Sequence, residues 1–313
     1  MIEIDRNRIN LCELEITPTT KTAWLFEPLK NISTKTTADY KDVPVDLTSP
    51  ENAEPLVDVR KFGIKSVPYY ATQAITCPTY QTNIWGASRI NYVRQGVGKK
   101  LAKVNKILAA LGLEVVVVDA HRSPRTQNFL FKAFVKKAEE EGFKGEDAIK
   151  WALTFCSRAD KFDPQDSKTW ALHSSGATVD CYLLDKKTQR VIDMGEQHFD
   201  RAAKETRMDY YEKLAEKKKL TKKQQGFLIA RRIFTNVMTS INGAIYGDEC
   251  WHVSLFDQYW GLLNNKPALY GYKQSPDDGK TNLISGKKEL KTLKTNLSSH
   301  TTNRRQRRSF SSQ

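Results

Sequence analysis

The chain has 313 residues, 39% of them hydrophobic, which is enough for one core of roughly 200 residues with extensions or for two small domains. No stretch approaches the roughly 20 consecutive apolar residues of a membrane span, and the acidic first residues lack the apolar segment of a secretory leader, so we expect a soluble cytoplasmic protein. The five cysteines are widely spaced and form no C-x-x-C pair, which argues against a disulfide framework and a cysteine-built zinc site.

Half of the formal net charge of +14 lies in the last part of the chain. From residue 286 onward the sequence has one acidic residue, Glu289, and is rich in Ser, Thr and Asn. Its basic residues are Lys287, Lys288, Lys291, Lys294, Arg304, Arg305, Arg307 and Arg308. This composition is typical of a disordered, solvated segment, so we assign 271–313 to a basic C-terminal tail. We expect nucleic acid to bind only non-specifically, through the charge of this tail.

Residues 1–55 contain recurring Thr and Pro without a sustained hydrophobic period, which predicts an irregular N-terminal arm, either extended on the core or a partly disordered lead-in. One folded domain is expected over residues 56–270. It should begin with a short strand at 56–59, followed by an amphipathic helix at 97–111 that ends at Gly112.

The rest of the domain alternates between strands and helices. The β-branched run at 115–118 predicts a buried strand, and Ser123 with Pro124 has the residue types of a helix N-cap and first turn. The helix that follows should end at Gly142. Further helices are predicted at 147–158, 203–220 and 222–241, and further strands at 178–184, 190–192 and 251–256. Few strands interspersed with helices indicate an α+β fold, with a small antiparallel sheet flanked by helices.

A possible pair of metal ligands occurs in the segment His173-Ser-Ser-Gly-Ala-Thr-Val-Asp180. Gly176 permits a tight turn after the histidine, and Asp180 falls inside an apolar strand, where a charged carboxylate is costly unless it is paired or metal-bound. A hydrolytic zinc site needs three nitrogen or oxygen ligands and one open position. The alternative is a loop histidine and a strand aspartate that are satisfied by hydrogen bonds.

A possible base and third ligand occur in Glu249-Cys-Trp-His252. The spacing is too short for the helical H-E-x-x-H arrangement, and in a continuous strand the two side chains would point to opposite faces. We therefore expect Glu249 at the entry to a strand and His252 within it. The alternative is a surface glutamate and a core histidine.

A third segment, Asp119-Ala-His-Arg122, follows the buried strand at 115–118 and opens a helix. Asp119 could hold the Arg122 guanidinium and direct it toward a developing oxyanion. The alternative is an ordinary salt bridge at the end of a strand.

The order and spacing of these segments resemble the zinc D,D-peptidases, and in particular the D-alanyl-D-alanine dipeptidases of the VanX type. That family shows the patterns D-x-Y-R-P-x-x-x-Q, S-x-H-x-x-G-x-A-x-D and E-W-W-H. In this chain Arg122 is followed by Gln127, His173 by Gly176 and Asp180, and Glu249 by Trp251 and His252. The resemblance covers about residues 56–260.

The resemblance implies one Zn2+ per chain, bound by His173, Asp180 and His252 at the sheet and its adjoining loops, with water in the fourth position. Glu249 would take a proton from that water and deliver it to the leaving amine, and Arg122 would stabilise the oxyanion. The implied substrate is the D-Ala-D-Ala dipeptide of cell-wall precursors. Asp200 would hold its free amino group, and the positions of Ala171 and Trp251 would also contact the substrate.

Three positions depart from the family pattern, and we expect them to affect substrate fit rather than metal binding. Ala171 stands where the family has serine, His121 replaces a tyrosine, and Cys250 replaces the first tryptophan of E-W-W-H. The terminal bond of a peptidoglycan stem, cleaved by a D,D-carboxypeptidase, is therefore an alternative substrate. A different class of function is a non-catalytic protein that binds polyanions through its basic tail.

Overall fold

A five-stranded sheet forms the centre of the computed structural model, which describes residues 2–35, 39–77, 80, 82–84, 86–196 and 204–277. The strand order is β2 (Lys65–Ser66), β4 (Leu113–Asp119), β5 (Thr178–Asp185), β7 (His252–Ser254) and β6 (Ala244–Ile245). The three pairings from β4 to β6 are antiparallel, as predicted. The edge strand β2 instead runs parallel to β4, because the chain between them passes through a helix and returns in the same direction. The fold is α+β, with a sheet that is antiparallel except at this edge.

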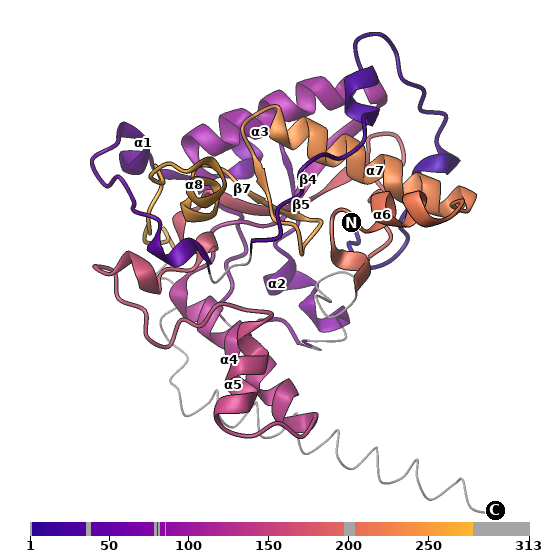
Figure 1. Ribbon diagram of the computed structural model, residues 1–313. Coiled ribbons are helices and arrows are strands. Elements are labelled where there is room, and N and C mark those ends of the chain that lie inside the picture. The colour runs from indigo at the N-terminus through magenta and orange to yellow at the C-terminus, as the bar shows by residue number, and fades with distance from the viewer. Residues whose placement is uncertain are drawn as a thin grey trace, which may run out of the picture. The chain divides into compact units, whose positions relative to one another are not determined.

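Helices cover both faces of the sheet (Figure 1). The α-helices are α1 (Pro50–Ala53), α2 (Tyr69–Thr72), α3 (Gln95–Leu108), α4 (Pro124–Glu140), α5 (Glu146–Leu153), α6 (Tyr210–Lys217), α7 (Lys222–Thr239) and α8 (Gln258–Asn264). Helices α3 and α7 lie on one side, whereas α2, α4 and α5 lie on the other (Figure 1). All eight residues of β5 are buried, as expected for a strand with both faces covered.

Short 3-10 helices and a second, two-stranded sheet connect these layers. The small sheet pairs β1 (Leu56–Asp58) with β3 (Tyr92–Arg94) in antiparallel register. The 3-10 helices are η1 (Leu11–Glu13), η2 (Ala23–Phe26), η3 (Asp39–Asp42), η4 (Val59–Phe62), η5 (Ala74–Thr76), η6 (Ala109–Leu111), η7 (Ser167–Thr169), η8 (Leu172–Ser175) and η9 (Lys204–Thr206).

The predicted N-terminal arm contributes directly to the main core. Its apolar residues Ile4, Ile9, Leu11 and Leu25 are buried there. Ile9 also forms a parallel bridge with Ile192, so the arm lies against the end of the sheet. At the other end, residues Met1–Pro276 make up one compact unit, and residues 278–313, which hold most of the predicted basic tail, lie outside the described residues. No helix among the described residues is long and apolar enough to cross a membrane.

Most predicted elements occur, with shifted boundaries. Ser123 caps α4 by accepting a hydrogen bond from the Thr126 N–H, and Gly112 adopts a left-handed conformation after η6, as predicted. The helix predicted at 147–158 ends at Leu153, and the one at 203–220 is regular only over α6. The strand predicted at 190–192 is reduced to isolated bridges, Leu184–Val191 and Ile9–Ile192.

Candidate functional site

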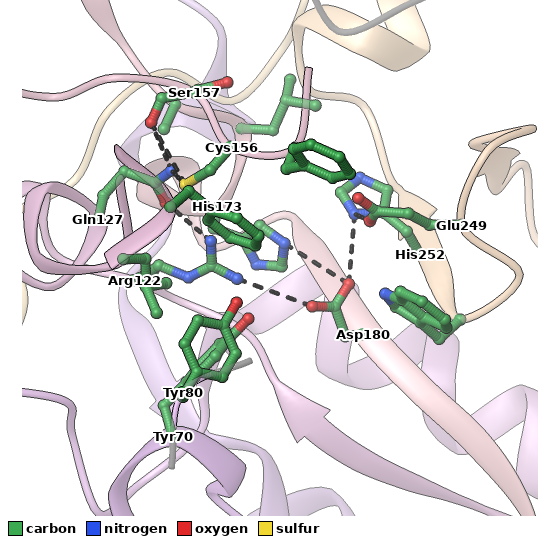
Figure 2. Close-up of a pocket in the computed structure, with 16 residues that line it drawn as sticks. Tyr70, Tyr80, Arg122, Gln127, Cys156, Ser157, His173, Asp180, Glu249 and His252 are labelled. Carbon is green, nitrogen blue, oxygen red and sulfur yellow. Dashed lines mark hydrogen bonds and ion pairs between the residues drawn. The ribbon is translucent and has the colours of Figure 1, made fainter. Parts of the chain in front are cut away.

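A single pocket brings together the residues predicted to carry the chemistry (Figure 2). Its polar end is lined by Arg122, Gln127, His173, Asp180, Glu249 and His252, together with Trp251. Its other walls come from α4, the segment after α5 and the segment around Tyr70. Elements from four distant parts of the chain therefore meet at one end of the sheet.

Strand register explains why Asp180 and His252 share a face of the sheet. Asp180 on β5 lies directly opposite His252 on β7, and also opposite Asp119 on β4. Directly opposed residues in an antiparallel pair have their Cβ atoms about 4.5–5.5 Å apart on the same side. The register of β4 shifts between Val117 and Asp119, and an irregularity of this kind redirects a side chain at the end of a strand.

His173 reaches the same point from η8, immediately before β5. Gly176 ends η8 with φ of 70°, and a Cβ at this position would lie 2.3 Å from Cδ2 of Leu56. The backbone angle therefore favours glycine here, and a larger residue would also have to displace the end of the Leu56 side chain. The Nδ1 atom of His173 lies 2.8 Å from the Ala120 carbonyl oxygen. A proton on Nδ1 would therefore leave the lone pair of Nε2 free to bind a metal.

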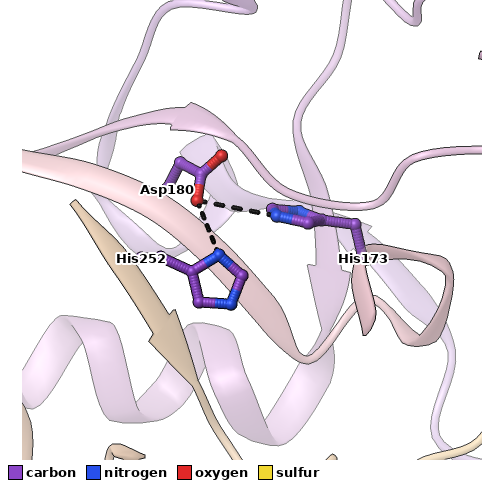
Figure 3. Close-up of side chains that lie close together, drawn as sticks. All are labelled: His173, Asp180 and His252. Atoms are coloured by element: carbon purple, nitrogen blue, oxygen red, sulfur yellow. Dashed lines mark ion pairs between the residues drawn. The ribbon is translucent and has the colours of Figure 1, made fainter. Parts of the chain in front are cut away.

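The three predicted ligands form a buried cluster (Figure 3). One ligand atom from each of His173, Asp180 and His252 lies within 4.8 Å of the other two. Oδ1 of Asp180 is 3.5 Å from Nε2 of His173 and 3.2 Å from Nδ1 of His252. This Oδ1 and both ring nitrogens of His252 are buried without a hydrogen-bond partner.

This donor set fits zinc. Two imidazole nitrogens and one carboxylate oxygen are typical ligands of a catalytic zinc, which leaves its fourth position open. Buried polar atoms without hydrogen bonds are costly, and a bound cation would satisfy them. Of the two residues in the alternative, the loop histidine His173 has a hydrogen-bond partner in the Ala120 carbonyl, whereas Oδ1 of the strand aspartate Asp180 has none.

Charges within the cluster shift the pKa values of its members. Burial alone would raise the pKa of Asp180, but the imidazoles of His173 and His252 hold it well below its usual value. Burial alone would lower the pKa of His252, but the carboxylates of Asp180 and Glu249 raise it to about 9. The cluster is thus an anionic site that attracts a proton or a metal cation.

Glu249 lies beside the cluster, as predicted. It belongs to the turn before β7, while His252 is the first residue of that strand. Its Oε2 is 3.3 Å from Nδ1 of His252, and its side chain is 14% exposed. The carboxylate is thus next to the ligand atoms and still reached by solvent.

Arg122 occupies the opposite side of the cluster. It donates hydrogen bonds to Oδ2 of Asp119 at 2.6 Å and to Oε1 of Gln127 at 2.8 Å, so these two side chains hold the guanidinium. It also lies 3.7 Å from Oδ2 of Asp180 and packs over the ring of Tyr70 at 4.9 Å. Although burial opposes its charge, these acids raise the pKa of Arg122 well above its usual value, so it remains cationic.

The apolar walls of the pocket were not predicted as part of the site. They include Leu130 and Phe134 of α4, Phe155, Leu172, Tyr70 and Tyr80. Phe134 stacks on Phe155 with ring centroids 5.4 Å apart. Gln127, Leu130 and Phe134 follow helical spacing, so this face of α4 was visible in the sequence, but its orientation toward the site was not.

The positions expected to affect substrate fit have different locations. Ala171 and Trp251 line the pocket. His121 and Cys250 are buried but do not line it: Nε2 of His121 lies 2.7 Å from the Lys273 carbonyl oxygen, and Cys250 is fully buried. Their predicted influence on substrate fit could therefore only be indirect. The predicted amine-binding residue Asp200 lies outside the described residues.

Comparison with known proteins gives limited similarity. No family model matches the chain, and no curated protein sequence matches it. Among solved structures, the search matched part of the chain to a crystal structure of the vancomycin-resistance D,D-pentapeptidase VanY, from a VanB-type resistance cassette, in complex with Zn(II). The TM-score is 0.29 and the identity is 13%, over 54% of this chain and 75% of that chain. The function of this chain therefore has to be argued from its own site.

Proposed function

We propose that this chain is a zinc-dependent D,D-peptidase that hydrolyses the D-Ala-D-Ala dipeptide. The observation that carries the proposal is the buried cluster of His173, Asp180 and His252, with the Glu249 carboxylate on one side and the Arg122 guanidinium on the other. A metal-ligand set, a carboxylate base and a fixed cation in one pocket are the components that hydrolysis of a peptide bond requires.

Each residue has a role that its position supports. His173, Asp180 and His252 would hold zinc, which when bound polarises a carbonyl and lowers the pKa of water. Glu249 is close to the ligands and partly exposed, so its carboxylate can take a proton from water and pass it to the leaving amine. Arg122 stays charged and is held by Asp119 and Gln127, so it can stabilise the negative charge that develops on the carbonyl oxygen.

The choice of a D-Ala-D-Ala substrate rests on the motif resemblance. A free dipeptide has an amino group next to the scissile bond, and Asp200 would pair with it. Ala171 provides no hydroxyl for this purpose, although it lines the pocket. A peptidoglycan stem peptide, cleaved at its terminal bond, is the second substrate to test.

Metal content and turnover of matched variants test the proposal. The wild-type protein, purified without chelator, is expected to contain one zinc, and His252→Ala should lose it because a ligand is gone. Glu249→Ala should retain zinc and lose turnover, by roughly 10²-fold or more if it acts as the general base. Free D-Ala-D-Ala and a stem pentapeptide ending in D-Ala-D-Ala should be assayed in parallel, because the preferred one identifies the substrate. A folded wild-type protein that binds no zinc would rule out the site.

A further inference from the structure

The turn that carries Glu249 is held by a neighbouring segment of the chain. This turn, residues 246–250, lies between strands β6 and β7. The Cys250 N–H donates to the Thr206 carbonyl at 3.0 Å, and the Met208 N–H donates to the Gly247 carbonyl at 2.9 Å. Arg207 also forms an ion pair with Asp248, next to the base. The position of Glu249 thus depends on where residues 204–209 lie.

Those residues have little regular structure of their own. They consist of the single 3-10 turn η9 and the irregular link that leads to α6. Backbone of this kind can shift unless tertiary contacts fix its carbonyl groups.

Arg231 of α7 provides such contacts. It is fully buried, and its guanidinium donates to the carbonyl oxygens of Glu205 at 2.5 Å, Arg207, and Met208 at 3.5 Å. Its Nε donates to the Met194 carbonyl at 2.8 Å. One rigid, forked cation therefore ties carbonyls of two irregular segments to a long helix. A lysine has only three donors, all on one nitrogen, and cannot reach the same spread of acceptors.

We propose that Arg231 is a positioning residue for the general base: it fixes residues 204–209, which in turn fix the turn bearing Glu249. This inference rests on the proposed hydrolytic function. Arg231 does not line the pocket, so it acts through the backbone and not by contact with substrate. A displacement of about 1 Å in a catalytic group can lower a rate by about 10²-fold, so loss of this support should reduce turnover without removing the metal ligands.

Hydrogen exchange tests, without any substrate, whether Arg231 fixes residues 204–209 and the turn that bears Glu249. In Arg231→Lys, the amides of Cys250 and Met208 should exchange at least about tenfold faster, while those of β4 and β5 stay protected. Arg232→Lys is the matched control, because Arg232 is the next residue on α7 but pairs with Glu212 on α6. Asp248→Asn removes the partly exposed ion pair with Arg207 and keeps an oxygen that can accept from the Tyr246 hydroxyl, so it should loosen the same amides to a smaller degree.

Steady-state kinetics of the zinc-loaded variants test the catalytic part, with D-Ala-D-Ala and the stem pentapeptide as substrates. Arg231→Lys should lower kcat by about 10²-fold with little change in KM or zinc content, and Arg232→Lys should leave kcat unchanged. In a Glu249→Gln background, Arg231→Lys should cause no further loss, because both changes act on one group.

The possible outcomes separate this inference from the proposed function. Unchanged exchange at Cys250 and Met208, or loosening spread equally over β4 and β5, would overturn the positioning role. Local loosening with an unchanged kcat would overturn it as well, while the hydrolytic function stood. If the wild type hydrolyses neither substrate, the proposed function fails, and the exchange result alone decides whether Arg231 fixes the turn.

Discussion

At the scale of single residues, the protonation state of His252 should control metal uptake. The neighbouring carboxylates of Asp180 and Glu249 raise its pKa from 6.5 to about 9 in the metal-free protein. A proton and a metal compete for the same imidazole, so apparent zinc affinity should rise about tenfold per pH unit up to about pH 9 and then level off. Zinc titrations with a competing chelator between pH 6 and 10 would measure this.

The same pKa shift gives the metal-free fold a pH-dependent stability. Because the folded-state pKa is raised, the charged imidazolium stabilises the fold fully below about pH 6.5, and this contribution is lost as the pH rises through about 9. Glu249→Gln removes one of the two carboxylates, so both the binding and the stability transitions should move to lower pH. Zinc affinity that is independent of pH over this range would contradict the assignment of His252 as a ligand.

At the scale of structural elements, Gly176 links the geometry of η8 to the metal site. Alanine at this position would adopt a left-handed conformation, costing about 1–2 kcal/mol, and its Cβ would also clash with Leu56. We expect Gly176→Ala to lower the free energy of unfolding by more than this backbone cost and to weaken zinc binding, because His173 lies on the same turn. Urea unfolding and zinc titration would measure the two effects.

Gly112→Ala is the matched control for this prediction. Its φ is 69°, but nothing lies within 4 Å of an added Cβ. Gly112→Ala should lower the free energy of unfolding only by the cost of the left-handed backbone, and it should bind zinc as the wild type does. Equal effects of the two substitutions on zinc affinity would show that η8 does not set the position of His173.

The elements that sequence alone could predict are those with a strong local signal. The apolar spacing of α3, the β-branched run in β4 and the Ser123 cap of α4 each depend on nearby residues, and all three occur. Strands β2 and β6 have two residues each, too few to show a period, and they form through pairing with β4 and β7. Long-range pairing of this kind leaves no local signature.

The functional site likewise combines features with a local sequence signal and features that depend on tertiary structure. The order of its motifs predicted which residues could be metal ligands, but the register that sets Asp180 opposite His252 is a tertiary property. Side-chain direction is another: His121 and Cys250 neighbour site residues in sequence, yet neither lines the pocket. Arg231 lies on a helix that the sequence predicts, but its role depends on carbonyl acceptors in segments far away in the chain.

At the scale of the whole molecule, metal binding should stabilise the entire fold, because the ligands come from η8, β5 and β7 and therefore join separate parts of the sheet. A ligand present at about 1,000 times its Kd stabilises the native state by about 4 kcal/mol. For a domain of this size, 1 kcal/mol raises Tm by roughly 2–4 °C, so saturating zinc should raise Tm by roughly 8–16 °C, and a chelator should reverse the shift. His252→Ala should lose this response.

His121→Ala supplies the control, because His121 is buried and contacts Lys273 but is not one of the three clustered ligands. It should lower Tm in the absence of zinc and keep the full zinc-dependent increase. If His121→Ala lost the increase and His252→Ala kept it, the stabilising metal would have to be bound elsewhere.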